Sequence, residues 1–338
     1  MNPIPTFGGE ESPLDYRTIV HKADMALPIL EGGYRYSPEE IENQRGVGIC
    51  TSISVVQNVQ KVNKKKYSPD FHYLLQKKFV DGGWWEGSSA FSALKVAFKY
   101  GFLPLNEFPY GEMDRTDYPS YIKKLQEIPE AEIDRLLTLC VDKIKGYAQV
   151  DVSDPWTLSQ AISSSKAGLI CRYVIGKEWF TPSWRPEDIN PLQPPAQIIS
   201  GHLVTMAGFD YKNDYIQRIA NTWSAFWNVQ GSGDVDYSKY RCTEAWMIYF
   251  DALPDRTYFK VPMKLKDTGL EVTKLQKFLV DKGHLVMPQG VSYGYYGSLT
   301  REAVYKFQIS ANIPMSWYER TVMRGSHTGS KTLEALNR

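Results

Sequence analysis

Several stretches before residue 101 carry an apolar residue at every third or fourth position, a spacing that predicts helices burying one face. The first such helix is predicted just after residue 50, with the apolar face Ile53, Val56, Val59 and Val62. The second is predicted to begin at Pro69, after the N-cap residue Ser68, with the apolar residues Phe71, Leu74, Leu75 and Phe79. A third helix is predicted over residues 89–100 and is ended by Gly101. These helices are expected to form one lobe.

From residue 148 onward the pattern changes to short runs in which apolar and polar residues alternate, which is typical of strands. A helix predicted at 154–165 interrupts them. The clearest runs are 201–210 and 215–220, and the polar turn between them predicts an antiparallel hairpin. A helical lobe followed by a β-rich lobe gives an α+β fold, with a cleft expected between the lobes.

The last part of the chain is predicted to be a separate domain of three short helices. Residues 253–264 are interpreted as a linker. The apolar positions that indicate the helices are Leu265, Val272, Leu275, Phe278 and Leu279, then Ala303, Val304 and Phe307, then Thr332, Leu333 and Leu336. We therefore expect an N-terminal extension over 1–25, a two-lobed domain over 26–252 and a helical domain without a catalytic set over 265–338.

Composition narrows the classes of function. The length of 338 residues suits two domains, and the net charge of +1 provides no field for binding nucleic acid. No run of about 18 apolar residues occurs, so no membrane span is expected. The first residues lack the basic start and apolar core of a secretory signal, and the chain has only four cysteines, so synthesis in a reducing cytoplasm is expected. We expect neither a cofactor nor a metal.

Cys50 is the most informative residue of the chain. It follows Gln44 by six positions, across a loop broken by glycines, and stands at the head of a predicted helix. A helix N-terminus favours thiolate over thiol, and its N–H groups, together with the Gln44 amide, can hold an oxyanion. A small buried hydrophobe is the alternative interpretation of a free cysteine. This segment alone does not separate the two.

A nucleophilic cysteine needs a base, and His202 is the best placed of the five histidines because it opens a predicted strand. Asn221 ends the next strand, so the hairpin would bring the two side chains together at its open end. An asparagine carboxamide there would fix the imidazole tautomer and leave the other ring nitrogen facing the thiol. The predicted catalytic set is therefore Cys50, His202, Asn221 and Gln44.

This region resembles the papain-like cysteine peptidases. The glutamine, glycine-rich loop and cysteine of that family match residues 44–50, and its histidine strand matches Gly201 and His202. Its asparagine and two tryptophans match Asn221, Trp223 and Trp227. The likeness runs from about residue 25 to about residue 250 in the order of the family.

The resemblance implies a two-lobed fold, a thiol mechanism that hydrolyses peptide bonds, and a cleft for a peptide or protein substrate. The backbone of a double glycine would pair with an extended substrate, and neighbouring tryptophans would border side-chain pockets, although both could simply be core residues. One tryptophan would also cover the histidine–asparagine hydrogen bond. The residues assigned to substrate binding in this way are Gly82, Gly83, Trp84, Trp85, Gly201 and Trp223.

Three departures from the family stand out. Val47 replaces a cysteine that usually forms a disulfide, and Thr51 replaces a tryptophan that usually follows the nucleophile. Too few residues precede the family-like region for a folded inhibitory propeptide. Either a compartment boundary separates enzyme and substrate, or residues 1–25 lie in the cleft as a plug, with a disordered or surface-packed tail as the simpler expectation.

Residues 265–338 resemble the peptidoglycan-binding domain found beside many cell-wall hydrolases. The glycine, apolar and glutamine positions of its helices match, but the long connection at 315–328 does not. A general helical interaction module is the alternative. We therefore expect a cysteine peptidase targeted to the bacterial cell wall, such as a phage endolysin that reaches the wall after lysis or delivery.

Other functions remain open from the sequence. The first alternative is a wall- or particle-anchored protease that acts on protein substrates. A transglutaminase-like or amidase reaction would use the same thiol and imidazole, and a non-catalytic binding protein would use neither.

Overall fold

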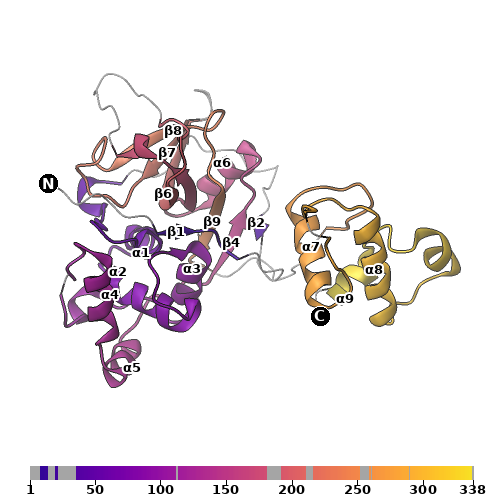
Figure 1. The fold of residues 1–338 in the computed structure, drawn as a ribbon, viewed down its shortest axis with the longest axis horizontal. Coiled ribbons are helices and arrows are strands. Elements are labelled where there is room, and N and C mark those ends of the chain that lie inside the picture. Colours follow the sequence, from indigo (N-terminus) through magenta and orange to yellow (C-terminus); the bar gives the residue numbers. More distant parts are fainter. Residues whose placement is uncertain are drawn as a thin grey trace. The chain divides into compact units, whose positions relative to one another are not determined.

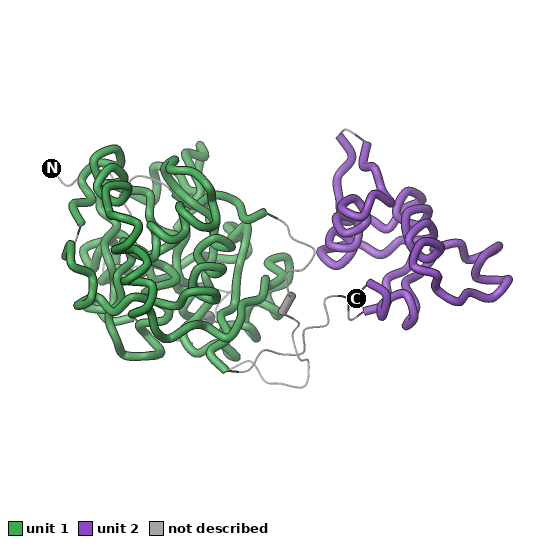
Figure 2. The backbone as a smooth tube through the Cα atoms, turned by 90° about the horizontal axis from the view of Figure 1, so that it is seen from below, with its two compact units in different colours: residues 1–13, 21–253 green, residues 14–20, 254–338 purple. Residues whose placement is uncertain are grey.

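The computed structural model describes residues 8–13, 20–21, 36–111, 113–180, 192–210, 216–251, 259, 261–288 and 290–336. The chain divides into two compact units, residues 1–13 with 21–253 and residues 14–20 with 254–338 (Figure 2). Much of the linker predicted at 253–264 and most of the extension predicted at 1–25 lie outside the described residues.

The first unit contains a group of helices, shown in indigo to magenta in Figure 1. They are α1 (Cys50–Asn63), α2 (Pro69–Gln76), α3 (Ala90–Lys99), α4 (Tyr118–Gln126) and α5 (Glu130–Thr138), with short 3-10 turns at η1 (Pro38–Glu40) and η3 (Leu105–Glu107). The three helices predicted from periodicity are confirmed as α1, α2 and α3. The Ser68 hydroxyl accepts a hydrogen bond from the Phe71 N–H at 3.1 Å, which is the predicted N-cap of α2.

The end of α2 differs from the prediction. The regular helix stops at Gln76 and continues as the π-helical turn η2 (Lys77–Asp81). The wider turn changes the angular position of the residues that follow, so Phe79, predicted on the apolar face, is 42% exposed. Lys77 is buried instead and pairs with Asp81 at 3.0 Å.

The β-rich part of the first unit is a seven-stranded sheet in the order β2-β4-β9-β5-β6-β7-β8. Its strands are β2 (Val20–His21), β4 (Gly146–Val150), β5 (Leu169–Ile175), β6 (Ser200–Asp210), β7 (Ile216–Ala220), β8 (Ser232–Asp236) and β9 (Glu244–Tyr249), with α6 (Pro155–Ser164) between β4 and β5 in sequence. The predicted hairpin is confirmed, because β6 and β7 pair antiparallel with Thr205 opposite Ala220. Cys171 is buried in β5, as expected of a core residue.

A second, very small sheet joins segments far apart in sequence. It consists of β1 (Gly9–Glu10), which is labelled in Figure 1, and β3 (Ser88–Ser89), and the two strands run parallel. The helix α1 is buried between the helical lobe and the large sheet, because Val55 and Val56 share a hydrophobic cluster with Ile170, Leu203 and Trp246. This packing fixes where α1 begins relative to the sheet.

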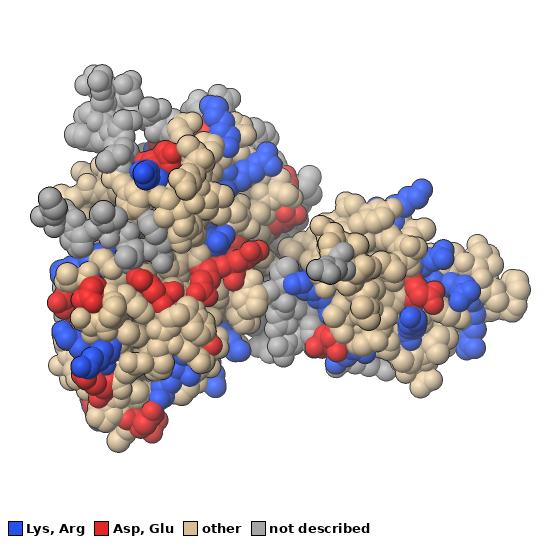
Figure 3. Space-filling model, viewed as in Figure 1, with Lys and Arg blue, Asp and Glu red and all other residues tan. Residues whose placement is uncertain are grey.

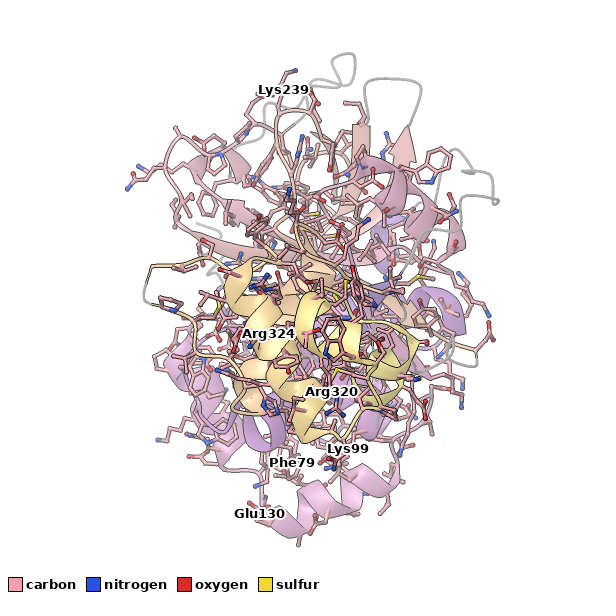
Figure 4. The ribbon with its side chains drawn as sticks, turned by 90° about the vertical axis from the view of Figure 1, so that its right-hand side faces the viewer. Phe79, Lys99, Glu130, Lys239, Arg320 and Arg324 are labelled. Carbon is pink, nitrogen blue, oxygen red and sulfur yellow. The ribbon has the colours of Figure 1, made fainter. Side chains whose placement is uncertain are left out.

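The second unit contains three helices in its described part, as predicted. They are α7 (Leu270–Asp281), α8 (Ser298–Ser310) and α9 (Ser330–Leu336), packed around a core that includes Leu275, Tyr296 and Val304. Leu265 was predicted on the first helix but precedes it. The connection at 315–328 contains the π-helical turn η5 (Glu319–Met323), which was not predicted and carries Arg320, with Arg324 just after it (Figure 4).

Charged side chains of both signs are interspersed over the face of the first unit seen in Figure 3, in keeping with the small net charge. Within the described ranges, no helix is both long enough and apolar enough to cross a membrane.

Candidate active site

Cys50 is the first residue of α1, and its side chain is fully buried. No side chain caps this helix start, and the backbone at Cys50 and Thr51 hydrogen-bonds the thiol instead. The backbone at Leu203 does the same from the neighbouring strand β6. Ser54 ties the two elements together further, because its hydroxyl donates to the Leu203 carbonyl at 3.0 Å. The first turn of α1 therefore lies against the strand that carries His202.

His202 and Asn221 are hydrogen-bonded, as the hairpin predicted. The imidazole Nε2 lies 2.7 Å from the Asn221 Oδ1, and both side chains are fully buried. Because Oδ1 can only accept, Nε2 carries the proton and Nδ1 is left with a lone pair. Among the residues that the structure describes, Nδ1 has no hydrogen-bond partner. The ring of Trp223 stacks on the imidazole at 4.6 Å between centroids, and Trp179 meets it edge-on at 6.0 Å.

Gln44 is held in one orientation by the residue that follows Asn221. The Gln44 N–H donates to the Thr222 carbonyl at 2.8 Å, and the Thr222 hydroxyl donates to the Gln44 Oε1 at 2.7 Å. Since the carboxamide oxygen accepts this bond, the amide nitrogen is turned away from Thr222. Thr222 could not be found from the sequence, because a threonine beside an asparagine carries no signal for a contact 178 positions away in the chain.

The charge state of the thiol–imidazole pair differs from the expectation of a thiolate. Burial raises the pKa of the Cys50 thiol to about 11, although the backbone hydrogen bonds from Leu203 and Gly8 act in the opposite direction. Burial lowers the pKa of His202 to about 4, against the opposing effect of its bond to Asn221. Both groups are therefore uncharged at neutral pH. In this state of the site, burial raises the pKa of the Cys50 thiol by more than the helix N-terminus lowers it.

Residues 8–13, which we call the cleft segment, lie against this buried site. Gly8 of this segment reaches the Cys50 thiol through a backbone hydrogen bond and accepts a hydrogen bond from the Ser88 N–H through its carbonyl at 2.7 Å. A Cβ atom added at Gly8 would lie 1.9 Å from the Gly48 carbonyl oxygen. Residues 8–13 of the predicted N-terminal extension thus lie beside Cys50, whereas Val20–His21 form the edge strand β2 of the large sheet.

Groups from both lobes hold the cleft segment. On the β-rich side, the Arg172 Nε donates to the Gly9 carbonyl at 2.9 Å, and the Glu244 carboxylate accepts from the Ser12 N–H at 3.1 Å. On the helical side, the Trp85 indole donates to the Glu10 carboxylate at 2.6 Å. Arg172 and Glu244 were not found from the sequence, because both lie on strands whose alternation marks them only as polar positions.

The residues predicted to bind substrate differ in what they contact. Trp85 and Gly201 contact the cleft segment, and a Cβ at Gly201 would lie 2.0 Å from the Gly9 carbonyl oxygen. Trp84 packs against the core of the helical lobe. Gly82 ends η2 with open space around it, and Gly83 lies under the ring of Trp85. The backbone that pairs with the cleft segment is that of β3, which follows Gly83 by a few residues in the sequence.

Comparison with known proteins supports the fold. No protein-family model and no curated protein matches the chain. Among solved structures, the chain is similar to xylellain, a cysteine protease from Xylella fastidiosa, with 18% identity over 75% of this chain and 98% of that chain and a TM-score of 0.57. It is also similar to the digestive procathepsin L 3 of Tenebrio molitor larval midgut, with 15% identity over 72% of this chain and 75% of that chain and a TM-score of 0.50.

A third similar structure is the recombinant stem bromelain precursor, with 18% identity over 72% of this chain and 77% of that chain and a TM-score of 0.50. The chain therefore has the papain-like α+β fold, with a helical lobe and a β-rich lobe, as predicted. At these identities the likeness establishes the fold alone.

Proposed function

We propose that the protein is a cysteine peptidase in which Cys50 is the nucleophile and His202 the base. One observation carries the proposal. The His202 imidazole has its Nε2 hydrogen-bonded to Asn221, and its Nδ1 has no partner among the described residues. The next residue of the same strand, Leu203, hydrogen-bonds the Cys50 thiol through its backbone. A thiol at a helix start, a base and an orienting carboxamide form the arrangement that activates a cysteine nucleophile.

The proposed reaction has two stages. The His202 Nδ1 takes the proton of the Cys50 thiol, and the sulfur attacks the carbonyl carbon of the scissile peptide bond. The backbone N–H of Cys50 and the Gln44 amide donate to the oxyanion, and the imidazolium returns its proton to the leaving amine. A water molecule, deprotonated by Nδ1, then attacks the thioester, and the acyl group leaves as a carboxylic acid while Cys50 regains its proton.

We further propose that the described form is latent. In a productive complex a carbonyl carbon faces the sulfur and its oxygen faces the oxyanion donors. The Gly8 carbonyl accepts from Ser88 instead, and it is the backbone of Gly8 that hydrogen-bonds the thiol. The cleft segment therefore fills the site without presenting a bond for attack, and it must move before a substrate can bind.

For the second unit we propose targeting to the bacterial cell wall, which would make a peptide bond of peptidoglycan the substrate. The support is the sequence pattern of residues 265–338 together with three helices at the predicted positions. The alternative substrate is a protein, with the second unit acting only as an anchor.

The test is incubation of the full chain and its Cys50→Ala variant with purified peptidoglycan and, separately, with a denatured protein. Products are identified by mass spectrometry, and the Gly8→Ala variant is included to open the cleft. Release of stem-peptide fragments that depends on Cys50 would support the wall peptidase, and cleavage of protein alone would support the alternative. Equal activity of the Cys50→Ala variant on either substrate would contradict the peptidase proposal.

A further inference from the structure

A buried ion pair lies outside the catalytic set. Arg115, in the loop before α4, donates to Asp70 of α2 through Nε at 2.9 Å and through Nη2 at 2.8 Å. The two side chains are 3% and 2% exposed, and the Tyr121 hydroxyl also donates to Asp70 at 2.9 Å. An apolar pair of similar volume could fill such a site with equal stability, so a buried ion pair calls for another explanation.

The same arginine holds the loop that carries Gln44, at two points. Its third donor, Nη1, donates to the Asn43 carbonyl at 2.8 Å, and its own carbonyl accepts from the Gly46 N–H at 2.8 Å. These bonds fall on either side of Gln44 in the sequence. A Cβ at Gly46 would lie 2.3 Å from the Thr116 carbonyl oxygen, so the backbones of the two loops touch here.

The planar guanidinium suits this arrangement. Two of its nitrogens are fixed on the two oxygens of Asp70, which sets the plane of the group and thereby the direction of Nη1. A lysine has one nitrogen at this distance from the backbone and cannot form the fork and the third bond together in the same geometry. Asp70 thus orients Arg115, and Arg115 fixes the backbone on both sides of Gln44.

We propose that Arg115 is a positioning residue for the oxyanion site, holding the segment Asn43–Gly46 so that the Gln44 amide stays where the oxyanion forms. The inference rests on the proposed function, because it requires Gln44 to stabilise a negative oxygen. Thr222 orients the Gln44 side chain, whereas Arg115 fixes the backbone that bears it. A displaced donor stabilises the transition state less while leaving substrate binding unchanged.

The decisive variant removes both charges at once. Asp70→Leu combined with Arg115→Met leaves no unpaired charge in the core, but the Tyr121 hydroxyl and the Asn43 carbonyl each lose a partner, so the variant is expected to fold with a thermal midpoint several degrees below the parent. In the full chain carrying Gly8→Ala, we expect kcat to fall about 10- to 100-fold with KM within about twofold. An unchanged kcat in the folded double variant would overturn the proposal.

Arg115→Lys is the second variant, in case the double variant does not fold. It keeps the charge beside Asp70 and is expected to fold, with kcat lowered by a similar factor. The matched control is the exposed pair of Arg135 and Glu132 on α5, where two bonds of 2.8 Å form the same fork. Glu132→Leu with Arg135→Met is expected to leave kcat unchanged.

A double-mutant cycle separates positioning from general support of the fold. If Arg115 acts through Gln44, the Arg115→Lys substitution should lower kcat much less in a Gln44→Ala background than in the parent. An equal fold-loss in both backgrounds would overturn the proposal. Failure of the proposed function itself would look different, because the activity would then be independent of Cys50 in every background.

Discussion

Replacing Gly8 by alanine should raise the activity of the protein, because the proposed latency requires the cleft segment to stay in place. The added Cβ would lie 1.9 Å from the oxygen and 2.5 Å from the carbon of the Gly48 carbonyl, and both are backbone atoms of the loop that leads into α1. Neither can rotate away as a side chain would. The cleft segment must therefore withdraw at Gly8, beside the thiol, although its contacts further along need not be broken.

The size of the effect follows from what is lost at that position. Withdrawal breaks the 2.7 Å hydrogen bond between the Ser88 N–H and the Gly8 carbonyl, which contributes about 1 kcal/mol. The buried packing of Gly8 against Gly48 contributes a similar amount, about 1 kcal/mol, if several dispersion contacts are lost together. A total of about 2 kcal/mol corresponds to a shift of about 30-fold in the ratio of open to closed cleft.

The assay is the rate at which the full chain cleaves a denatured protein, corrected for the rate of the Cys50→Ala variant. We expect Gly8→Ala to be faster than the parent by up to about 30-fold. The control is Glu11→Ala in the same segment, where the side chain is exposed and the rate should not change. Equal rates for the parent and Gly8→Ala, with both dependent on Cys50, would refute the reasoning, because the cleft segment would then not limit access.

Three further predictions concern the catalytic groups. Iodoacetamide should alkylate Cys50 in the parent at neutral pH about 100-fold more slowly than an ordinary thiol, because a pKa of about 11 instead of 9.0 lowers the thiolate fraction. The alkylation rate should rise as the pH approaches the Cys50 pKa of about 11, and the midpoint of this pH dependence should lie at lower pH in Gly8→Ala. An unchanged midpoint would show that the cleft segment does not cause the raised pKa. Asn221→Ala should lower kcat about 10- to 100-fold in an opened variant, since His202 loses the bond that fixes its tautomer, and a loss confined to KM would contradict that role. Gln44→Ala should lower kcat about 100- to 1000-fold with little change in KM, and steady-state kinetics would show whether the loss falls on KM instead.

Three residues of the proposed catalytic set each have a local signal in the sequence. Cys50 begins an apolar-periodic helix, and His202 and Asn221 lie at the same end of a hairpin whose strands alternate clearly. The helix and strand positions followed from the same patterns. Such signals depend only on residues close together in the chain, and they identify elements and their ends.

Pairing between distant segments left no such signal. β1 and β3 are two residues long, too short for an alternation, so nothing in the sequence indicated that Gly9 would lie beside Ser88. The π-helical turn η2 also changes the angular position of the chain between α2 and β3, which periodicity at 3.6 residues per turn does not detect. The charge state of Cys50 could not be predicted either, because it depends on how deeply the folded chain buries the thiol, and one of the residues that contact the thiol, Gly8, lies some 40 positions earlier.

The cleft segment belongs to the same chain as the site that it fills, and this covalent tether sets its effective concentration. At an effective concentration of about 1 mM, which intramolecular tethers can give, an intrinsic dissociation constant of about 10 µM would suffice for about 99% occupancy. The same residues supplied as a free peptide at micromolar concentration would then inhibit poorly. Proteolysis between the cleft segment and the rest of the chain would let the segment dissociate and be diluted, so the cleft would then stay open. A contact that is weak in itself can therefore keep the cleft closed until a single cleavage opens it permanently.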